Sequence, residues 1–514
     1  MRGEALKSNV GLHGGHPGRG SEAAALRLEN RRLRDDNDRL NAENGELRAK
    51  NDLLDAANKK LRLENEELRA RLSLNSGNSS KPPSTDGLGR GRVGKQRGLR
   101  EKSGKRPGGQ PGHPGNCLKQ VEAPDRTVQC RPQVCGHCGV RLPHDGGVVG
   151  ERRQVFDIPP PPQIEVTEFQ RIDIICPHCH GGNSGMFPDN VNGPVQYGDN
   201  ISATIVSLTH GNSVAIKRAA DFVNDSVLGV RVSTGTICNL LERCWVGLSL
   251  WLLMVKLALQ NASSVNFDET GIHINGKIYW LHSASTEWLT YLYLHPRRGS
   301  QGSDSAGVLP AFHGVATHDC WSPYFNYDAC SHNLCRAHLL REMIAIGKEA
   351  GEFTWAGQMK SLLKEMKFEV DSAGAAGLDA VAPEIIADIS KRYDDILELA
   401  ARQHPSKEGG YWTRKAFNLA KRLREHRGEV LCFLEDVAIP FDNNQAERDI
   451  RGSKVKMKVS GCFRSVEGGE YYAALESYLS TARKNGVGQI EAIKMLLAGK
   501  PYFPPAMRVD GNAD

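Results

Sequence analysis

The chain has 514 residues, of which 39% are apolar, and its 66 Lys and Arg outnumber its 60 Asp and Glu, for a net charge of +6. This length is too great for one ordinary core and predicts two to four domains, with the 54 glycines and 25 prolines predicting linkers. The Gly-rich residues 1–22 lack a signal peptide's apolar core and predict a disordered N-terminus. Val246 to Val255, the longest apolar stretch, is too short for a membrane span and predicts a buried helix. Thirteen cysteines without a secretory signal favour a cytosolic protein with reduced thiols.

Leucine recurs at every seventh residue from Leu26 to Leu68, and asparagine at every seventh residue from Asn30 to Asn65. If leucine occupies heptad position d, every asparagine occupies position a. This pattern predicts a parallel coiled coil over residues 23–72 that pairs two chains, because paired amides fix the register. The alternative, a lone surface helix, would leave seven leucines exposed.

Residues 73–115 are rich in Ser, Gly and Pro and cannot form a core. Between Arg90 and Arg106 they carry eight cations against one acid, Glu101. The composition predicts a disordered basic arm that binds phosphates without reading sequence, or alternatively a solvated linker.

Two Cys-x-x-Cys pairs lie in the next segment, residues 116–192. Each pair offers two thiolates from one tight turn, as a tetrahedral structural Zn²⁺ requires, and residues 163–175 alternate well enough to supply the strands of a hairpin between them. A redox dithiol is the alternative, but Pro132 and Gly139 flank the first pair where a strand and a helix would be needed. The predicted zinc ligands are Cys135, Cys138, Cys176 and Cys179.

Helical patterns follow over residues 193–260, at 200–210, 213–224 and 233–255. The last begins at a Ser/Thr cap and follows a short turn. This arrangement fits a helix-turn-helix DNA-binding region or a simple helical bundle.

The period changes to that of strands over residues 261–332. Val265–Asp268 is a short strand, and a hairpin from 272 to 280 turns at Asn275-Gly276. Residues 289–294 form a third strand, and Gly314–Asp319 a fourth that also ends on an aspartate. Helices are then predicted at 334–349, 358–372, 383–403 and 413–434, within a segment of residues 333–437.

Residues 439–458 predict a further helix, with Asp442 as its N-cap and Gln445 closing a capping box. Their spacing places one acid and three cations on one helix face: Glu447, Arg451, Lys454 and Lys458. Such a face suits a metal ion on a polyphosphate backbone, whereas the plainer interpretation is an exposed helix with a Glu447–Arg451 ion pair.

Asp268 and Asp319 at strand ends and Glu447 on the helix can converge on one site. Oxygen ligands left open to water and substrate are what Mg²⁺ or Mn²⁺ requires, and two such ions about 3.5–4 Å apart support in-line displacement at phosphorus. Glu269 and Asp328 are the rival carboxylates.

Several ordered motifs match a known family: 75–84 (NSGNSSKPPS), 105–113 (KRPGGQPGH), the paired Cys-x-x-Cys segment, 268–270 (DET), 335–338 (CRAH), 442–448 (DNNQAER) and 460–465 (SGCFRS). Over residues 75–490 the chain resembles bacterial transposases of the insertion sequence 66 family, which are DDE transposases with a ribonuclease-H-like catalytic core. The resemblance implies a multidomain α+β protein. Its catalytic core would comprise 261–332 and 438–495, separated by an all-helical insertion and followed by a tail at 496–514.

The resemblance implies that Asp268, Asp319 and Glu447 are the first, second and third catalytic acids. Two Mg²⁺ or Mn²⁺ ions would serve them, in a bacterial, nucleoid-associated enzyme that cleaves DNA at its element's ends and joins it to target DNA. The side chains expected to contact DNA are Arg448, Arg451, Lys454, Lys458, Arg336 and His338. For Cys335 and His338 the implied role is structural or DNA-positioning rather than metal binding.

Two other classes of function remain open from the sequence. One is a DNA-binding regulator, dimerised by the coiled coil, that uses its zinc and helical modules without chemistry. The other is a domesticated, inactive transposase. Accessory proteins encoded by the element are further expected partners, and membrane association is not expected.

Overall fold

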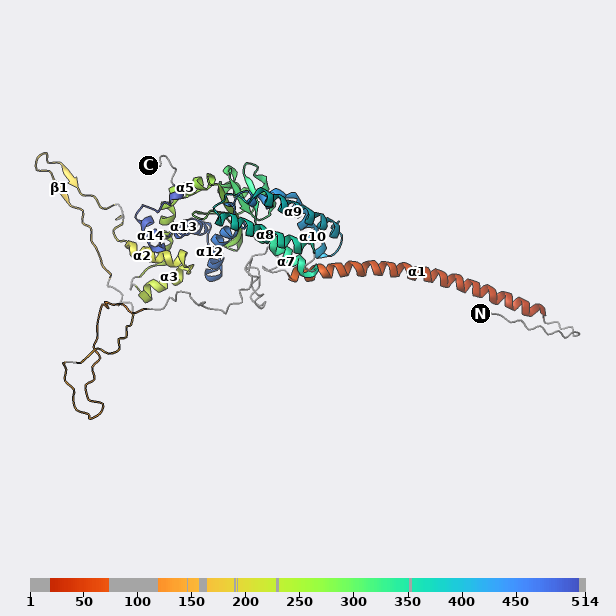
Figure 1. Cartoon of the computed structure of the whole chain (residues 1–514), viewed down its shortest axis with the longest axis horizontal. Helices are drawn as coiled ribbons and strands as arrows, with labels where there is room; N and C mark the ends of the chain where they lie inside the picture. Colours follow the sequence, from red (N-terminus) through yellow and green to blue (C-terminus); the bar gives the residue numbers. More distant parts are fainter. Residues whose placement is uncertain are drawn as a thin grey trace.

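The computed structural model describes residues 19–73, 119–145, 147–156, 164–188, 191, 193–227, 231–350 and 354–507. The predicted N-terminal disorder lies almost entirely outside these residues, as does nearly all of the basic arm. Helix α1 (Arg19–Ser73) projects from the folded body as one long rod, and the hairpin of β1 (Asp173–Ile175) and β2 (Gly182–Ser184) projects at the opposite end (Figure 1). No helix in the described ranges has the length and apolar character needed to cross a membrane.

One five-stranded sheet organises the body. Its strands are β3 (Ser264–Ile274), β4 (Lys277–Ser285), β5 (Thr290–His295), β6 (Val315–His318) and β7 (Ser331–Leu334). They lie in the order β5-β4-β3-β6-β7, with the first three antiparallel and with β6 and β7 parallel to β3. The predicted strands at 265–268 and 272–274 are halves of one strand, β3, and β7 was not predicted.

The predicted Asn-Gly hairpin is present between β3 and β4. Asn275 and Gly276 have φ angles of 46° and 77°, and Ile274 pairs with Lys277 across the turn. Two consecutive positive φ values match the twist of a two-residue hairpin, which is why this dipeptide is a reliable turn signal. The turn sets the β3–β4 register and therefore which β3 side chains face each side of the sheet.

Helices α12 (Asn444–Ser460) and α13 (Val466–Lys484) cover one face of the sheet. The even-numbered β3 residues Ile272 and Ile274 pack there against Tyr472 of α13. The α13 helix also satisfies the edge of β5, because Ser477 and Thr481 accept hydrogen bonds from backbone N–H groups of that strand. An exposed strand edge is a hazard for unwanted pairing, and here a helix closes it.

The other face of the sheet shares a core with the N-terminal helical region. This region contains α2 (Asp199–Val206), α3 (Ile216–Phe222), α4 (Thr234–Gly247) and α5 (Ser249–Gln260), and the predicted cap is confirmed because Ser233 accepts the Thr236 N–H. Phe267 of β3 and Trp251 of α5 belong to one continuous apolar cluster. The predicted buried helix at 246–255 spans the junction of α4 and α5, and its exposed Val246 and Leu250 show that it is buried on one side only.

Residues after β7 form the predicted all-helical stretch: α7 (Arg336–Ala350), α8 (Trp355–Ala375), α9 (Pro383–Gln403), α10 (Tyr411–Glu425) and α11 (Arg427–Leu431). They enclose a second core, which includes Trp355 and Phe433. The α9 bounds match the sequence prediction because Pro383 is well suited to the first helical position.

The end of α1 rests on α10, where Ala70 is buried and Glu67 pairs with Arg414 at 2.6 Å. Helix α14 (Gln489–Leu497) packs against α2 near the end of the described chain.

Candidate active site

Asp268 lies on the β3 face that α12 covers, two residues from Asn266, whose side chain bonds the start of that helix. Its Oδ1 accepts the Glu269 backbone N–H at 2.9 Å. Burial raises the pKa of Asp268 well above its ordinary value, and the negative charges of Glu269, Asp319 and Glu447 raise it further. Both other predicted acids therefore lie within electrostatic range of Asp268.

Asp319 immediately follows β6. Parallel pairing of Asn266 with Thr317 aligns β3 and β6, so that Asp319, directly after the end of β6, lies level with Asp268. The predicted strand end at Asp268 is wrong, because β3 continues to Ile274 and Asp268 lies in the middle of it. The Asp319 Oδ1 accepts the Trp321 backbone N–H at 3.0 Å, which fixes the turn after the strand.

Glu447 lies in the first turn of α12. Asn443 anchors this turn, since its Nδ2 donates to the Phe267 carbonyl at 2.7 Å and its Oδ1 accepts from Asn266 at 2.9 Å. The start of the helix is therefore tied to the strand residues that precede Asp268.

The predicted capping box is wrong, although the predicted helix is present. The helix begins at Asn444, and the Asp442 carboxylate accepts the N–H of Asn444 at 3.0 Å instead of a later one. Gln445 does not reach back but donates to Asp449, a buried carboxylate that also binds Lys484 at 2.8 Å. A tertiary anchor at Asn443 and a buried charge at Asp449 replace the local cap.

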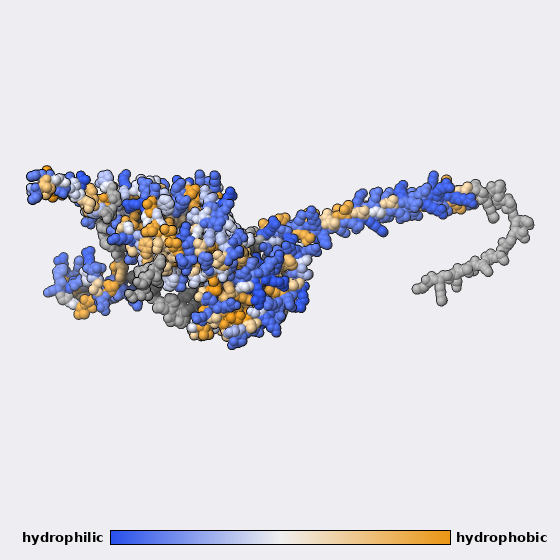
Figure 2. Space-filling view, turned by 90° about the horizontal axis from the view of Figure 1, so that it is seen from above, coloured by the Kyte–Doolittle hydropathy of each residue, from blue (hydrophilic) through white to orange (hydrophobic). Residues whose placement is uncertain are grey.

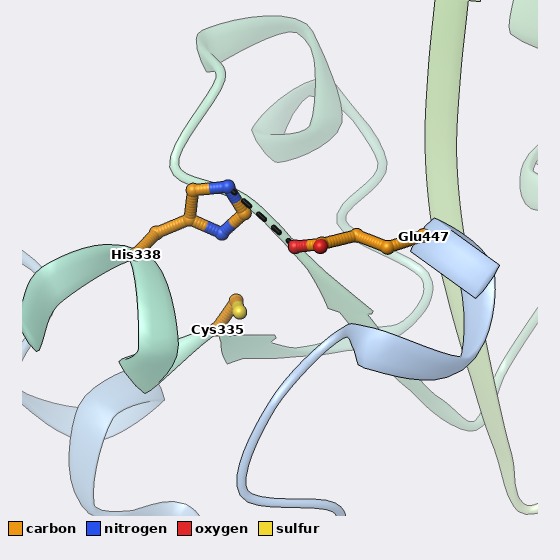
Figure 3. A group of neighbouring side chains, drawn as sticks. All are labelled: Cys335, His338 and Glu447. Carbon is orange, nitrogen blue, oxygen red and sulfur yellow. Dashed lines mark ion pairs between the residues drawn. The ribbon is translucent and has the colours of Figure 1, made fainter. Parts of the chain in front are cut away.

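Three cations surround the Glu447 carboxylate. Oε1 lies 3.8 Å from His338 Nε2 (Figure 3). It also lies 3.7 Å from Arg341, and Oε2 lies 4.0 Å from Arg451. Burial by itself would lower the pKa of His338, but the nearby Cys335 sulfur and Glu447 carboxylate raise it to about 9. The predicted Glu447–Arg451 ion pair is therefore only one of three long contacts.

The basic face of α12 divides into exposed and anchored residues. Arg448, Arg451 and Lys458 are exposed, whereas Lys454 is half-buried and donates to the Gly271 carbonyl of β3 at 2.8 Å. Burial lowers the pKa of Lys454 and the negative charge of Asp268 opposes that shift. Lys454 therefore links α12 to β3 beside the acid cluster.

Arg336 is buried, which corrects its predicted place at a DNA surface. Its side chain is 0% exposed, lies over the Phe433 ring, and donates to the carbonyls of Val430 and Pro440 and to Asn333. Such a guanidinium holds the β7–α7 junction together from the inside. The motif at residues 335–338 predicts a role for Arg336, but the sequence alone does not show whether this arginine is buried or exposed.

The rival carboxylate Glu269 is buried and fully engaged, whereas Asp328 is exposed. Tyr324 donates to Oε2 of Glu269, and Arg298 donates to Oε1 at 2.7 Å. Sequence reasoning gave no role to either partner. Burial and the charge of Asp319 raise the pKa of Glu269, while Tyr324 and Arg298 lower it.

The two Cys-x-x-Cys pairs form tight turns. Gly139 N–H donates to the Cys135 carbonyl, and His180 N–H donates to the Cys176 carbonyl, each at 2.9 Å. Neighbouring N–H groups lower the pKa of the Cys135 and Cys176 thiols. In the described part of the chain no three of the four predicted zinc ligands lie within 4.8 Å of one another, and the β1 hairpin projects separately from residues 119–156 (Figure 1). Within the predicted strand region 163–175, the described residues 164–175 contain one strand, β1.

Comparison with known families gives two matches. Residues 194–471, more than half of the chain, match the model described as Transposase IS66 family, and residues 27–119 match a family of unknown function (DUF6444). The chain belongs to the IS66 transposase family. No curated protein matches it. The family assigned from the sequence is therefore confirmed.

A transposase of this family acts on DNA, and its family suggests a divalent metal. The acid cluster fits such an ion by its chemistry: it combines hard carboxylate oxygens, a buried Asp268 whose pKa three other acids influence, and a buried Glu447 Oε1 without a hydrogen bond. Clustered carboxylates repel one another, and a divalent cation would offset that repulsion.

Proposed function

We propose that the chain is a DDE transposase that cleaves DNA at the ends of its own element and transfers the strands to target DNA. Asp268, Asp319 and Glu447 are its catalytic acids. The observation that carries this proposal is that β3–β6 pairing and the Asn443 anchor bring Asp319 and the start of α12 beside Asp268, although Asp319 and Glu447 lie 51 and 179 positions away in the sequence. The charges of both acids raise the pKa of Asp268. Acids that are far apart in the sequence but interact electrostatically in the fold indicate a functional site.

The sheet supports a ribonuclease-H-like core. Three antiparallel strands followed by two parallel ones, in the order β5-β4-β3-β6-β7, place the first acid on the central strand and the second directly after its parallel neighbour. The third acid comes from α12, which packs on β3 after the helical stretch. Glu269 is a weaker candidate than Asp268, because Tyr324 and Arg298 occupy its oxygens.

Asp268, Asp319 and Glu447 would hold Mg²⁺ or Mn²⁺, which when bound supplies Lewis acidity at the scissile phosphorus. The remaining groups position the substrate. Arg451 and Lys458 stand exposed on the α12 face that carries Glu447, where they can contact DNA phosphates. Lys454 keeps that face against β3 through its bond to Gly271.

The outer modules suit recognition and pairing of DNA ends. The seven heptad leucines of α1 are each 49–60% exposed in the single chain, and orange patches interrupt the blue surface of this helix (Figure 2). A second α1 would cover this stripe and form the predicted parallel dimer. We assign the basic arm to non-specific phosphate binding. We assign the two Cys-x-x-Cys turns and the region 193–260 to end recognition.

The test is a strand-transfer assay with the purified full chain, DNA carrying the ends of its element, and Mg²⁺. We expect Asp268→Asn, Asp319→Asn and Glu447→Gln each to reduce the rate by at least about 10²-fold, the scale of losing one preorganised electrostatic group. Asp328→Asn is the matched control, since Asp328 is an exposed carboxylate of the same region. DNA binding by each variant is measured in parallel and should persist.

Full activity of Asp268→Asn would refute the assignment of the acids. If the wild-type chain binds element ends but cuts none of them with Mg²⁺ or Mn²⁺, the DNA-binding regulator or the inactive domesticated transposase is the better description. Inverted repeats that bracket the reading frame would favour an active element.

A further inference from the structure

Cys335, His338 and Glu447 form the one group of three or more Cys, His or acidic side chains, within the described ranges, whose ligand atoms all lie within 4.8 Å of one another (Figure 3). Cys335 ends the β7–α7 junction and His338 lies three residues on, so the first turn of α7 presents both on one side. Glu447 reaches them from the first turn of α12. The Cys-x-x-His motif places Cys335 and His338 near one another in the sequence, and the fold brings Glu447 to them.

Two of these groups lack hydrogen-bond partners. His338 Nδ1 and Glu447 Oε1 are both buried and have no hydrogen bond, and the contacts of Oε1 with His338 Nε2 and Arg341 are 3.7 Å or longer. A buried polar atom without a hydrogen bond costs about 1–3 kcal/mol, so two such atoms on neighbouring members of the triad point to a missing ligand. Cys335 is 2% exposed, and its sulfur accepts the Asn443 backbone N–H at 3.2 Å. Outer hydrogen bonds of this kind orient the ligands of metal sites.

The chemistry of the three donors selects the metal. One sulfur, one imidazole nitrogen and one carboxylate oxygen suit Zn²⁺, whereas Mg²⁺ prefers oxygen alone. With metal–ligand distances of about 2.0–2.3 Å, tetrahedral donors lie about 3.5 Å apart, so side-chain adjustments of roughly 1 Å would close the set. A fourth position opens toward a cavity of about 170 Å³ that Asp319, Glu342 and Arg422 also line.

We propose that Cys335, His338 and Glu447 bind Zn²⁺, and that this binding withdraws Glu447 from Asp268 and Asp319 and holds the transposase inactive. The site itself stands on the geometry of the three side chains, and its inhibitory effect rests on the proposed catalytic role of Glu447. Arg341 and Arg451 stand near the same carboxylate and repel a cation, so Zn²⁺ binds here more weakly than in a site of four cysteines. Weaker binding makes the inhibition reversible.

Binding is tested first with Co²⁺ as a spectroscopic substitute for Zn²⁺ in the full chain freed of metal. Thiolate-to-cobalt charge-transfer absorption counts the sulfur-bound metal, including any at the Cys-x-x-Cys pairs. We expect Cys335→Ser and His338→Gln each to lose one equivalent of that absorption relative to the wild type. Cys320→Ser is the matched control, because Cys320 lines the same cavity outside the triad and should retain the full signal. Identical titrations of wild type and Cys335→Ser would overturn the site.

Inhibition is tested by adding Zn²⁺ to strand-transfer reactions at fixed Mg²⁺, with each variant normalised to its own rate without Zn²⁺. Changes to the outer partners of a metal ligand already cost about 10- to 100-fold in affinity, so loss of a direct ligand should raise the half-inhibitory Zn²⁺ at least about 10-fold. Equal sensitivity of Cys335→Ser and wild type would overturn the inhibitory role even if the cobalt signal is lost. The cobalt titration requires no catalysis, so it decides the site even if the proposed transposase activity fails.

Discussion

Tyr324 donates its phenolic hydrogen to the buried carboxylate of Glu269, the residue next to the proposed first catalytic acid. Burial and the surrounding carboxylates raise the pKa of Tyr324 well above its ordinary value, so the phenol stays protonated as a donor. Arg298 donates to the other oxygen of the Glu269 carboxylate. The Arg298 guanidinium lies over the Trp321 ring, 4.1 Å from its centroid. Tyr324 and Arg298 thereby hold the Glu269 carboxylate in one position beside Asp268.

Tyr324→Phe removes this donor and keeps the ring. A hydrogen bond to a charged group contributes about 1.5–3 kcal/mol, so we expect strand transfer to fall roughly 10- to 100-fold with DNA binding retained. Because Tyr324 lowers the pKa of Glu269, its loss raises that pKa and moves the acidic limb of the pH–rate profile to higher pH. Tyr327→Phe, which loses a surface bond to Asp304, should leave the profile in place.

Glu476 makes stability depend on pH. Burial between α12 and α13 raises its pKa to about 7, which Arg483 at 3.8 Å only partly opposes. The folded state thus favours the protonated form, so its stabilising effect is complete below about pH 4.5 and is lost as the pH rises through 7.

Glu476→Gln should abolish this loss. At pH 8 we expect the variant to unfold with a free energy higher than wild type by up to about 3 kcal/mol, and the difference should vanish near pH 4. Urea unfolding at both values measures it, with the exposed Glu398→Gln as control. A difference that does not change with pH would contradict the argument.

Arg336→Lys should destabilise the protein without changing its DNA contacts. Lysine keeps the charge but cannot reach Val430 and Asn333 with one planar fork, and burial already lowers the pKa of Arg336 to about 10. We expect a loss of about 2–4 kcal/mol in unfolding free energy. The exposed Arg402→Lys should cost almost nothing. A weaker DNA affinity with normal stability would restore the DNA-contact prediction.

Replacement of Arg451 and Lys458 together by Gln should weaken DNA binding and its salt dependence. Each phosphate contact contributes about 0.9 to the slope of log K against log salt, so the slope should fall by roughly 1.8. Titrations at several salt concentrations measure this change. Exposed cations of α9, Lys391 and Arg402, provide a control pair of equal charge, and an equal effect from that pair would show that the α12 face is not special.

Leu40→Glu combined with Leu47→Glu should separate the proposed dimer. Burial of one leucine at the dimer interface stabilises the dimer by about 1.5–3 kcal/mol, whereas a buried carboxylate at the same position destabilises it. Light scattering should report twice the chain mass of 56.4 kDa for wild type and a single mass for the variant. Leu53→Glu with Leu63→Glu changes leucines outside the heptad stripe and should leave the dimer intact.

Local signals predicted the elements that local physics determines. The turn at Asn275-Gly276, the cap at Ser233 and the helix start at Pro383 each need only near neighbours, and each lies where the sequence indicates. Strand β7 was missed because it is a four-residue edge strand, exposed at Ser331 and buried only at Asn333 and Leu334, and is too short to show a periodicity of its own.

The site was predicted less evenly. The spacing and motifs indicate Asp268, Asp319 and Glu447 as the catalytic acids, and this assignment stays a prediction. In the fold, the charges of Asp319 and Glu447 raise the pKa of Asp268. Other features of the site could not be predicted from the sequence. The buried position of Arg336 and the ion pair between Glu269 and Arg298 depend on contacts between distant segments. The meeting of Cys335 with Glu447 is of the same kind, since 112 positions separate them in the sequence.

One long-range contact has a consequence for folding. The Trp251 indole, 0% exposed, donates its N–H to the carbonyl of Tyr502, 251 positions later. Tyr478 packs edge-on against the same indole, and its hydroxyl accepts the Tyr502 N–H. Contacts that join such distant segments slow folding, because the chain entropy is lost before the contact stabilises anything. Shortened chains that end before Tyr502 lose this contact and should be less stable at α5, and in the full chain the docking of this C-terminal segment should be a slow step of folding.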